Sequence, residues 1–108
     1  MIQIEDYVII NIDNQYPDPS VFSGLKVISC GLNSKSSVTA SSISENDFVF
    51  CLQRSITTLS GAELSPQEFC VKWRYKPKEI YKALEFITAL LILDIAVDAI
   101  RSITICML

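Results

Sequence analysis

The stretch from Pro77 to Arg101 contains no glycine and no second proline, and it is rich in alanine, leucine, glutamate and lysine. These are good helix formers, and proline suits the first position of a helix, so we predict one long helix over about 77–101. Its middle segment, FITALLIL at 86–93, is apolar on every side apart from Thr88. Because such a helix has to be covered all round, we expect it to lie in the core or across a subunit contact.

The segment just before this helix has a different periodicity. Apolar and polar residues alternate from 69 to 76, which is the two-residue period of a strand with one buried face. The motif SPQE at 65–68 matches a helical capping box, so we predict a helical turn there and then a strand. The residues expected to point inward are Phe69, Val71, Trp73 and Tyr75, and those expected to point outward are Cys70, Lys72, Arg74 and Lys76.

The N-terminal third also favours strands. Residues 2–12 are rich in β-branched side chains and predict one long strand, with a bulge near Glu5 and Asp6. Asn, Asp and two prolines at 13–20 indicate a turn. Two glycines bound a short predicted strand at 24–31.

Three segments allow two interpretations each. The serine-rich stretch 33–44 is an exposed edge strand or a flexible loop, and its composition favours the loop. Residues 44–61 fit a helix or a strand, and their Phe, Val, Ile and Thr content favours the strand. Residues 102–108 extend the long helix or form a last strand.

Together these patterns predict a single α+β domain over residues 1–108. Its expected architecture is an antiparallel sheet of four or five strands from residues 2–75, packed by one long C-terminal helix at about 77–101. The predicted core residues are Val8, Ile10, Val27, Phe50, Trp73, Leu84, Ile87, Leu91 and Ile95.

The sequence argues against most catalytic chemistry. There is no histidine, so the usual general base and the His-containing triads are absent. The four cysteines form no Cys-x-x-Cys pair, and the three glycines are too widely separated for a phosphate loop. Asp94 and Asp98 share a helix face, but such a pair is usually a solvated stripe. We therefore predict no catalytic residue, no metal site and no cofactor, and no enzymatic activity.

Five basic residues gather between 72 and 82 on a chain whose net charge is −3. They are Lys72, Arg74, Lys76, Lys78 and Lys82. The simplest interpretation is the solvated side of a strand and of the next helical turns. The alternatives are a docking surface for an acidic protein and a site for nucleic acid or another polyanion. Trp73 and Tyr75 would point to the other face, where they cannot stack on the same bases.

Half of the chain is hydrophobic, which is high for a small monomer in water. We therefore expect a homodimer, with Phe86, Leu90 and Leu93 as self-association residues. The leading functional prediction is a non-enzymatic, acidic interaction protein, such as a regulator, an inhibitor or an immunity-type factor, that binds another protein. The alternative is a nucleic-acid or polyanion-binding module that uses 72–82. MIQIEDYVII at the N-terminus lacks the pattern of a signal peptide, so we expect a cytoplasmic location. The apolar run before Asp94 is too short to cross a bilayer, so we expect no membrane association.

Overall fold

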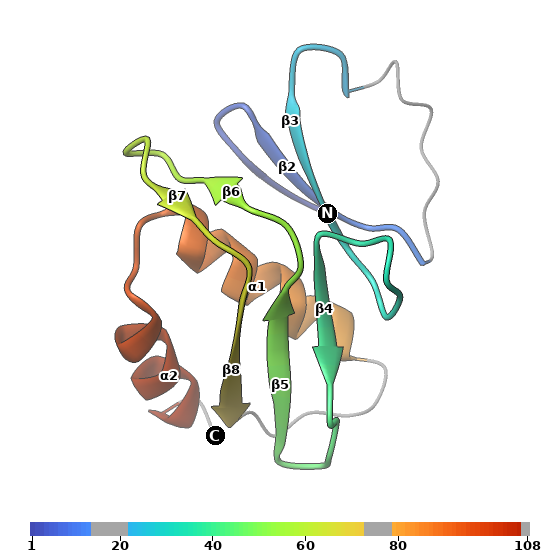
Figure 1. The fold of residues 1–108 in the computed structure, drawn as a ribbon, viewed down its shortest axis with the longest axis vertical. Coiled ribbons are helices and arrows are strands. Elements are labelled where there is room, and N and C mark those ends of the chain that lie inside the picture. Colours follow the sequence, from blue (N-terminus) through green and yellow to red (C-terminus); the bar gives the residue numbers. More distant parts are fainter. Residues whose placement is uncertain (14–21, 73–78, 107–108) are drawn as a thin grey trace.

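The computed structural model describes residues 1–13, 22–72 and 79–106, with side chains described up to residue 102. The fold is α+β (Figure 1). Its elements are β1 (Ile2–Ile4), β2 (Tyr7–Asn11), β3 (Lys26–Cys30), β4 (Val38–Ser41), β5 (Asp47–Leu52), β6 (Ile56–Thr57), β7 (Glu63–Leu64), β8 (Gln67–Lys72), α1 (Ile80–Ile92) and α2 (Val97–Cys106).

The main sheet has six strands in the order β1-β2-β3-β4-β5-β8, and β6 and β7 form a separate two-stranded sheet. The predicted all-antiparallel sheet is wrong in this respect. The pairs β1–β2, β4–β5 and β5–β8 are antiparallel, whereas β2–β3 and β3–β4 are parallel. The β3–β4 pairing consists of one residue pair, Cys30 and Val38. The connection 31–37 brings the chain back beside the last residue of β3. From there β4 continues in the same direction as β3 and beyond its end, so no further pair can form.

The N-terminal segment folds as a hairpin and does not form the single bulged strand predicted for 2–12. β1 and β2 pair antiparallel through Ile4 and Tyr7, which leaves Glu5 and Asp6 as a two-residue turn. Glu5 adopts a φ of 51°, in the left-handed region that such tight turns require. Alternating hydrophobicity continues across this turn, which is why the pattern resembles that of one strand.

Of the ambiguous segments, 33–44 contains a strand, β4, where a flexible loop was favoured. The strand predictions for 24–31 and 44–61 are confirmed by β3, β5 and β6. At 65–68 the predicted helical turn is wrong, since β8 already begins at Gln67. From there the predicted alternation holds through Lys72: Phe69 and Val71 are buried, and Cys70 and Lys72 are exposed. Residues 73–76 lie outside the described part of the chain.

The single long helix is wrong: two helices, α1 and α2, take its place. α1 ends in a Schellman motif, in which the Asp94 N–H donates to the Leu91 carbonyl and the Ile95 N–H donates to the Leu90 carbonyl. Asp94 supplies the left-handed residue of this motif, with a φ of 65°. Glycine or asparagine usually occupies that position, so the sequence contains no conventional stop signal here. For 102–108, the helical alternative holds through Cys106.

The core lies between the main sheet and α1, which covers one of its faces, while α2 lies beside β8 (Figure 1). Among the predicted core residues, Val8, Ile10, Phe50, Leu84, Ile87 and Leu91 are buried. Val27 is 45% exposed, so its assignment to the core is wrong. It follows Lys26 on β3 and points away from Ile28, which is the β3 residue that packs in the core. Ile95 packs against the core while half-buried, and Trp73 lies outside the described residues.

Candidate interaction surface

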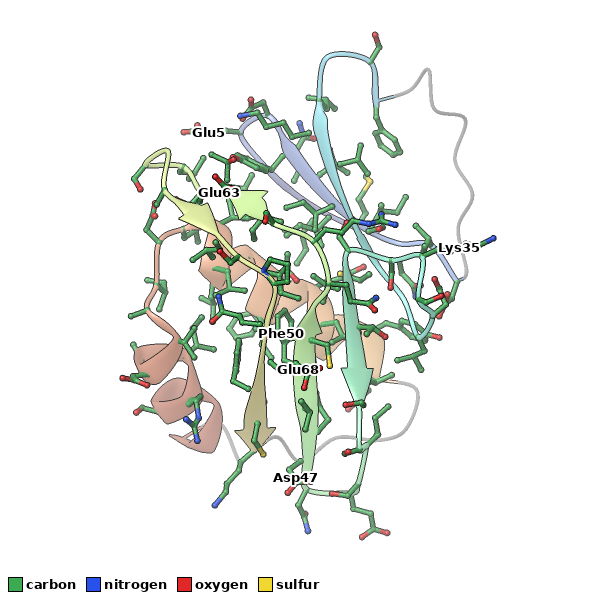
Figure 2. All side chains as sticks on the ribbon, viewed as in Figure 1. Glu5, Lys35, Asp47, Phe50, Glu63 and Glu68 are labelled. Carbon is green, nitrogen blue, oxygen red and sulfur yellow. The ribbon has the colours of Figure 1, made fainter. Side chains whose placement is uncertain are left out.

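Strands β4, β5 and β8 turn one face away from α1 and toward solvent, and we call it the outer face (Figure 2). The cross-strand register assigns alternate residues to it, because side chains along a strand point to opposite faces in turn. Figure 2 shows Glu68 standing on this side. The outer face consists of Thr39, Ser41, Asp47, Val49, Cys51, Glu68, Cys70 and Lys72.

One end of the outer face is hollowed. The hollow has a volume of about 550 Å³, and its polar groups are hydroxyls, amides, one thiol and one carboxylate. The Cys51 thiol is held at its edge, 3.6 Å from the Ser41 hydroxyl and 3.6 Å from the Val49 carbonyl. The residues around the hollow are Thr39, Ser41, Cys51, Leu52, Gln53, Pro66, Gln67 and Glu68. With this mixture of neutral polar groups and one carboxylate, the hollow suits hydrogen bonding to a polar partner surface.

The predicted basic surface is described only in part. Lys72 is exposed on the outer face, directly across from Asp47 of β5. Lys82 is exposed in the first turns of α1. Arg74, Lys76 and Lys78 lie outside the described residues, so a continuous basic surface over 72–82 stays a prediction.

The predicted self-association residues follow one stripe of α1. Phe86 and Leu90 are half-buried, and Leu93 is 46% exposed at the C-cap. The spacing of four and then three residues places them on the same side of the helix. Lys82 begins the same stripe. The side of α1 that faces away from the core is therefore apolar over its second half.

A polar cluster around Asp13 ties the end of β2 to the β3–β4 connection and to α1. The Asp13 carboxylate accepts hydrogen bonds from the Leu32 N–H at 2.8 Å, the Asn33 amide at 2.7 Å and the Tyr81 hydroxyl at 2.7 Å. Gly31 permits this close approach, since a Cβ there would lie 2.8 Å from both the Asp13 Oδ1 and the Asn33 Nδ2.

These hydrogen bonds set the protonation of the cluster. The Leu32 N–H, with smaller contributions from Tyr81 and Asn33, lowers the pKa of Asp13 against the opposing effect of desolvation. The bond to Asp13 in turn raises the pKa of Tyr81. Asp13 is thus an ionised acceptor with its donors in place, and it acts as a structural tie.

A second carboxylate, Asp94, fastens the β6–β7 turn to the end of α1. It accepts hydrogen bonds from the Thr58 hydroxyl at 2.5 Å, the Ser60 hydroxyl at 2.7 Å and the Ser60 N–H at 3.0 Å. The Thr58 hydroxyl is the main cause that lowers the pKa of Asp94. Asp94 therefore has a structural role. It shares no helix face with Asp98, because Asp94 lies after the end of α1 and Asp98 lies in α2.

The remaining reactive group with a displaced pKa is buried. Burial raises the pKa of Cys30 to about 12, and the Thr88 hydroxyl lies 3.9 Å from its sulfur. A thiol in that state is a poor nucleophile at neutral pH. Among the described residues, no three His, Cys, Asp or Glu side chains are placed to hold a metal ion. No helix in the same part of the chain is long and apolar enough to cross a membrane.

Sequence reasoning missed the hollow because it assigned 33–44 to a loop and 65–68 to a helical turn. Two walls of the hollow come from those segments, through Thr39 and Ser41 on one side and Pro66 and Gln67 on the other. The sequence feature that indicated a strand here is the segment Val38-Thr39-Ala40-Ser41, in which small apolar side chains alternate with hydroxyl side chains. Comparison with known proteins adds no candidate: no family model matches the chain, and no curated protein or solved structure matches it significantly.

Proposed function

We propose that this chain is a non-enzymatic interaction protein that binds another protein through the outer face and associates with itself through α1. The observation that carries the proposal is that α1 covers one side of the main sheet, whereas the other side carries a hollow. A partner that fills the hollow gains a shaped, partly apolar contact with hydrogen-bonding groups around it.

The charge of the outer face favours a protein over a nucleic acid. Asp47 and Glu68 carry two negative charges there, and Lys72 carries one positive charge. Nucleic-acid affinity depends on neutralising phosphates with clustered cations. A face with a net negative charge works against that, whereas it suits a partner with a mixed or mildly basic surface.

The apolar stripe of α1 supports the homodimer. A helix of this length extends about 20 Å, which is too short to bury by itself the ~800 Å² per partner of a standard interface. Phe86, Leu90 and Leu93 are therefore proposed as the centre of the contact, with neighbouring surface around them. Packing two such stripes against each other would cover the exposed part of Leu93.

The reactive groups support a role without catalysis. A general acid or base works best with a pKa near the working pH. Among the described residues, the four groups with displaced pKa values are shifted away from neutrality: the pKa values of Asp13 and Asp94 are lowered, and those of Tyr81 and Cys30 are raised.

Affinity capture with outer-face variants tests the proposal. Ser41→Lys combined with Glu68→Lys changes two exposed side chains at the hollow, and Glu63→Lys is the matched control on β7 (Figure 2). Proteins retained from the source cells by the wild type and by the control should be lost with the double variant. The same set captured by all three proteins, or no specific protein captured by the wild type, would contradict a docking role for this face.

Light scattering during size exclusion tests the dimer. The wild type should have twice the chain mass of 12.1 kDa at micromolar concentration. Leu93→Lys should shift it to the monomer, and lysine near a helix C-terminus does not oppose the helix dipole. Ile43→Lys is the control, because Ile43 is equally exposed, at 45% against 46%, in the β4–β5 turn. A wild type that is monomeric at every concentration would rule out the homodimer.

A further inference from the structure

The main sheet splits between β3 and β4, and the split leaves a cleft. β3 and β4 pair only at Cys30 and Val38, so toward its N-terminal end β3 separates from its neighbour. The chain leaving β5 forms the opposite wall through residues 54–57, which include β6. The space between the walls has a volume of about 280 Å³.

The cleft runs along the edge of β3. Three consecutive β3 residues line it, Lys26, Val27 and Ile28, and consecutive side chains point to opposite faces of a sheet. A cavity that touches all three follows the strand edge and does not lie over one face. Within the described part of the chain, that edge has a strand partner only at Cys30. An unpaired strand edge presents backbone donors and acceptors to an incoming extended chain.

Positive charge flanks the cleft on both walls, although the protein as a whole is acidic. Lys26 stands on the β3 wall and Arg54 on the opposite wall. The Lys26 ammonium lies 4.9 Å from the centre of the Tyr7 ring and 3.6 Å from the Asp6 carboxylate. Arg54 is exposed and belongs to no ion pair among the described residues. Its guanidinium is therefore available for two parallel hydrogen bonds to a carboxylate.

The cleft is held in shape by the side chain of Tyr7. Its ring lines the cleft, and its hydroxyl donates a short hydrogen bond to the Thr57 carbonyl, joining β2 to β6. Tyr7 is buried, and Ile28 and Ile56 add buried apolar surface. Ser37, Ser55 and Thr57 supply hydroxyl groups along the walls.

We infer that this cleft binds an extended acidic segment of a partner protein, which adds as a strand to the edge of β3 and places a carboxylate between Lys26 and Arg54. The volume falls just below the range of pockets that hold drug-sized ligands, ~300–1,000 Å³, so it fits one or two side chains of a longer segment. Strand addition supplies the remaining contact through main-chain hydrogen bonds. This inference rests on the proposed function as an interaction protein, and it adds a surface separate from the outer face.

The test uses the purified full chain and an acetylated, amidated peptide of alternating threonine and glutamate, followed by amide chemical shifts. Binding should move the amide signal of Val27, which lines the cleft and whose backbone groups point away from β2. Arg54→Gln should weaken the affinity about tenfold or more, as expected for the loss of a charge-assisted pair. Lys26→Gln should have a smaller effect, because Asp6 already neutralises part of its charge. Lys35→Gln, an exposed lysine outside the cleft, is the control and should bind like the wild type.

Two further probes separate strand addition from simple anion binding. A peptide with N-methyl groups on alternate amides cannot pair with the β3 edge and should lose binding, and a glutamine-for-glutamate peptide should bind weakly. The inference is overturned if the acidic peptide does not bind, or if the N-methylated peptide binds equally well. Inorganic phosphate or glutarate that binds as tightly and moves the same signals would also overturn it, in favour of a small-anion site.

The proposed function is judged separately. If the peptide fails while the outer-face variants still lose a protein partner, only this inference falls. If the peptide binds and no protein depends on the outer face, the proposed docking face falls and the cleft stands.

Discussion

The contact between Phe50 and Phe69 offers a direct test of how β5 and β8 are joined. The two residues face each other in the register, and their rings stack with centroids 5.0 Å apart and an interplanar angle of 27°. Phe50 is fully buried, and Phe69 is 9% exposed. Both belong to the hydrophobic core. We expect Phe50→Leu, Phe69→Leu and the double variant to reveal a coupling between these positions.

The magnitude follows from burial and ring contact. Phenylalanine to leucine removes about three carbon atoms, which is worth up to ~2.4 kcal/mol at ~0.8 kcal/mol per buried methylene. Each single variant also loses the ring pair, worth about 0.5–1.5 kcal/mol. We therefore expect Phe50→Leu to lower the free energy of unfolding by about 2–3 kcal/mol, with Phe69→Leu slightly less. The double variant should fall short of the sum by the ring-pair energy, because that contact is lost only once.

Urea unfolding measures these changes. With a slope of about 1.5–2 kcal/mol per molar urea, Phe50→Leu should move the midpoint down by roughly 1–2 M. Val49→Ala, next to Phe50 but on the outer face, is the control and should cost less than about 1 kcal/mol. Strict additivity of the two phenylalanine changes would refute the ring contact, and a larger loss for Val49→Ala than for Phe50→Leu would refute the assigned faces of β5.

Four further predictions concern the Asp13 cluster and the buried thiol. The pKa of Asp13 in the folded protein lies below the ordinary value of 3.8, so ionised Asp13 stabilises the fold above pH 3.8, and this stabilisation is lost as the pH falls through the folded pKa. Asp13→Asn should therefore make the melting temperature less dependent on pH between about pH 5 and 3. An unchanged dependence of the melting temperature on acid pH would contradict this. Tyr81→Phe removes the hydrogen bond to Asp13 and should lower the free energy of unfolding at neutral pH by about 0.5–1 kcal/mol. This value is small because the hydrogen bond is exposed to solvent. An unchanged free energy of unfolding in chemical denaturation would contradict a structural role for this bond. Gly31→Ala should lower the free energy of unfolding by about 1 kcal/mol or more in the same assay, because the added methyl displaces the bonded Asp13 and Asn33 side chains. In an Asp13→Ala background, which removes the Asp13 carboxylate, the same change should have a smaller effect, and an equal effect would contradict this reason. Iodoacetamide at pH 8 should label Cys70 in the folded protein and Cys30 only after unfolding, as peptide mass spectrometry would show, and early labelling of Cys30 would contradict its burial.

The residue pattern alone predicted the faces of several elements. The alternation predicted from residue 69 correctly assigned Phe69 and Val71 to the inside and Lys72 to solvent. Helix propensity correctly assigned α1, together with the burial of Leu84 and Ile87. These predictions succeeded because a strand or a helix with one buried face repeats its apolar residues at its own period. The absence of histidine likewise restricted the catalytic chemistry, because composition does not depend on how the chain folds.

The candidate surfaces were less accessible from sequence. Periodicity shows which side chains of a segment are buried, but it does not show which strands become neighbours. The hollow depends on β4, β5 and β8 being adjacent, and the cleft depends on β3 and β4 separating after one residue pair. Lys26 and Arg54 are far apart in the chain and share no local motif. Of the predicted surface residues, Phe86, Leu90 and Leu93 do fall on one stripe, because that placement depends only on helix geometry.

By itself, then, the sequence determined the α+β class, the buried side of β8 and the lack of imidazole chemistry, since each depends on composition or local period. Only the tertiary structure decided where α1 ends and which strands pair in the main sheet. Asp94 can adopt the left-handed conformation that ends α1 while its carboxylate is bound by Thr58 and Ser60, from a turn more than 30 residues earlier in the chain. The reason is physical: a residue without a strong local preference takes the conformation that its distant hydrogen-bond partners stabilise.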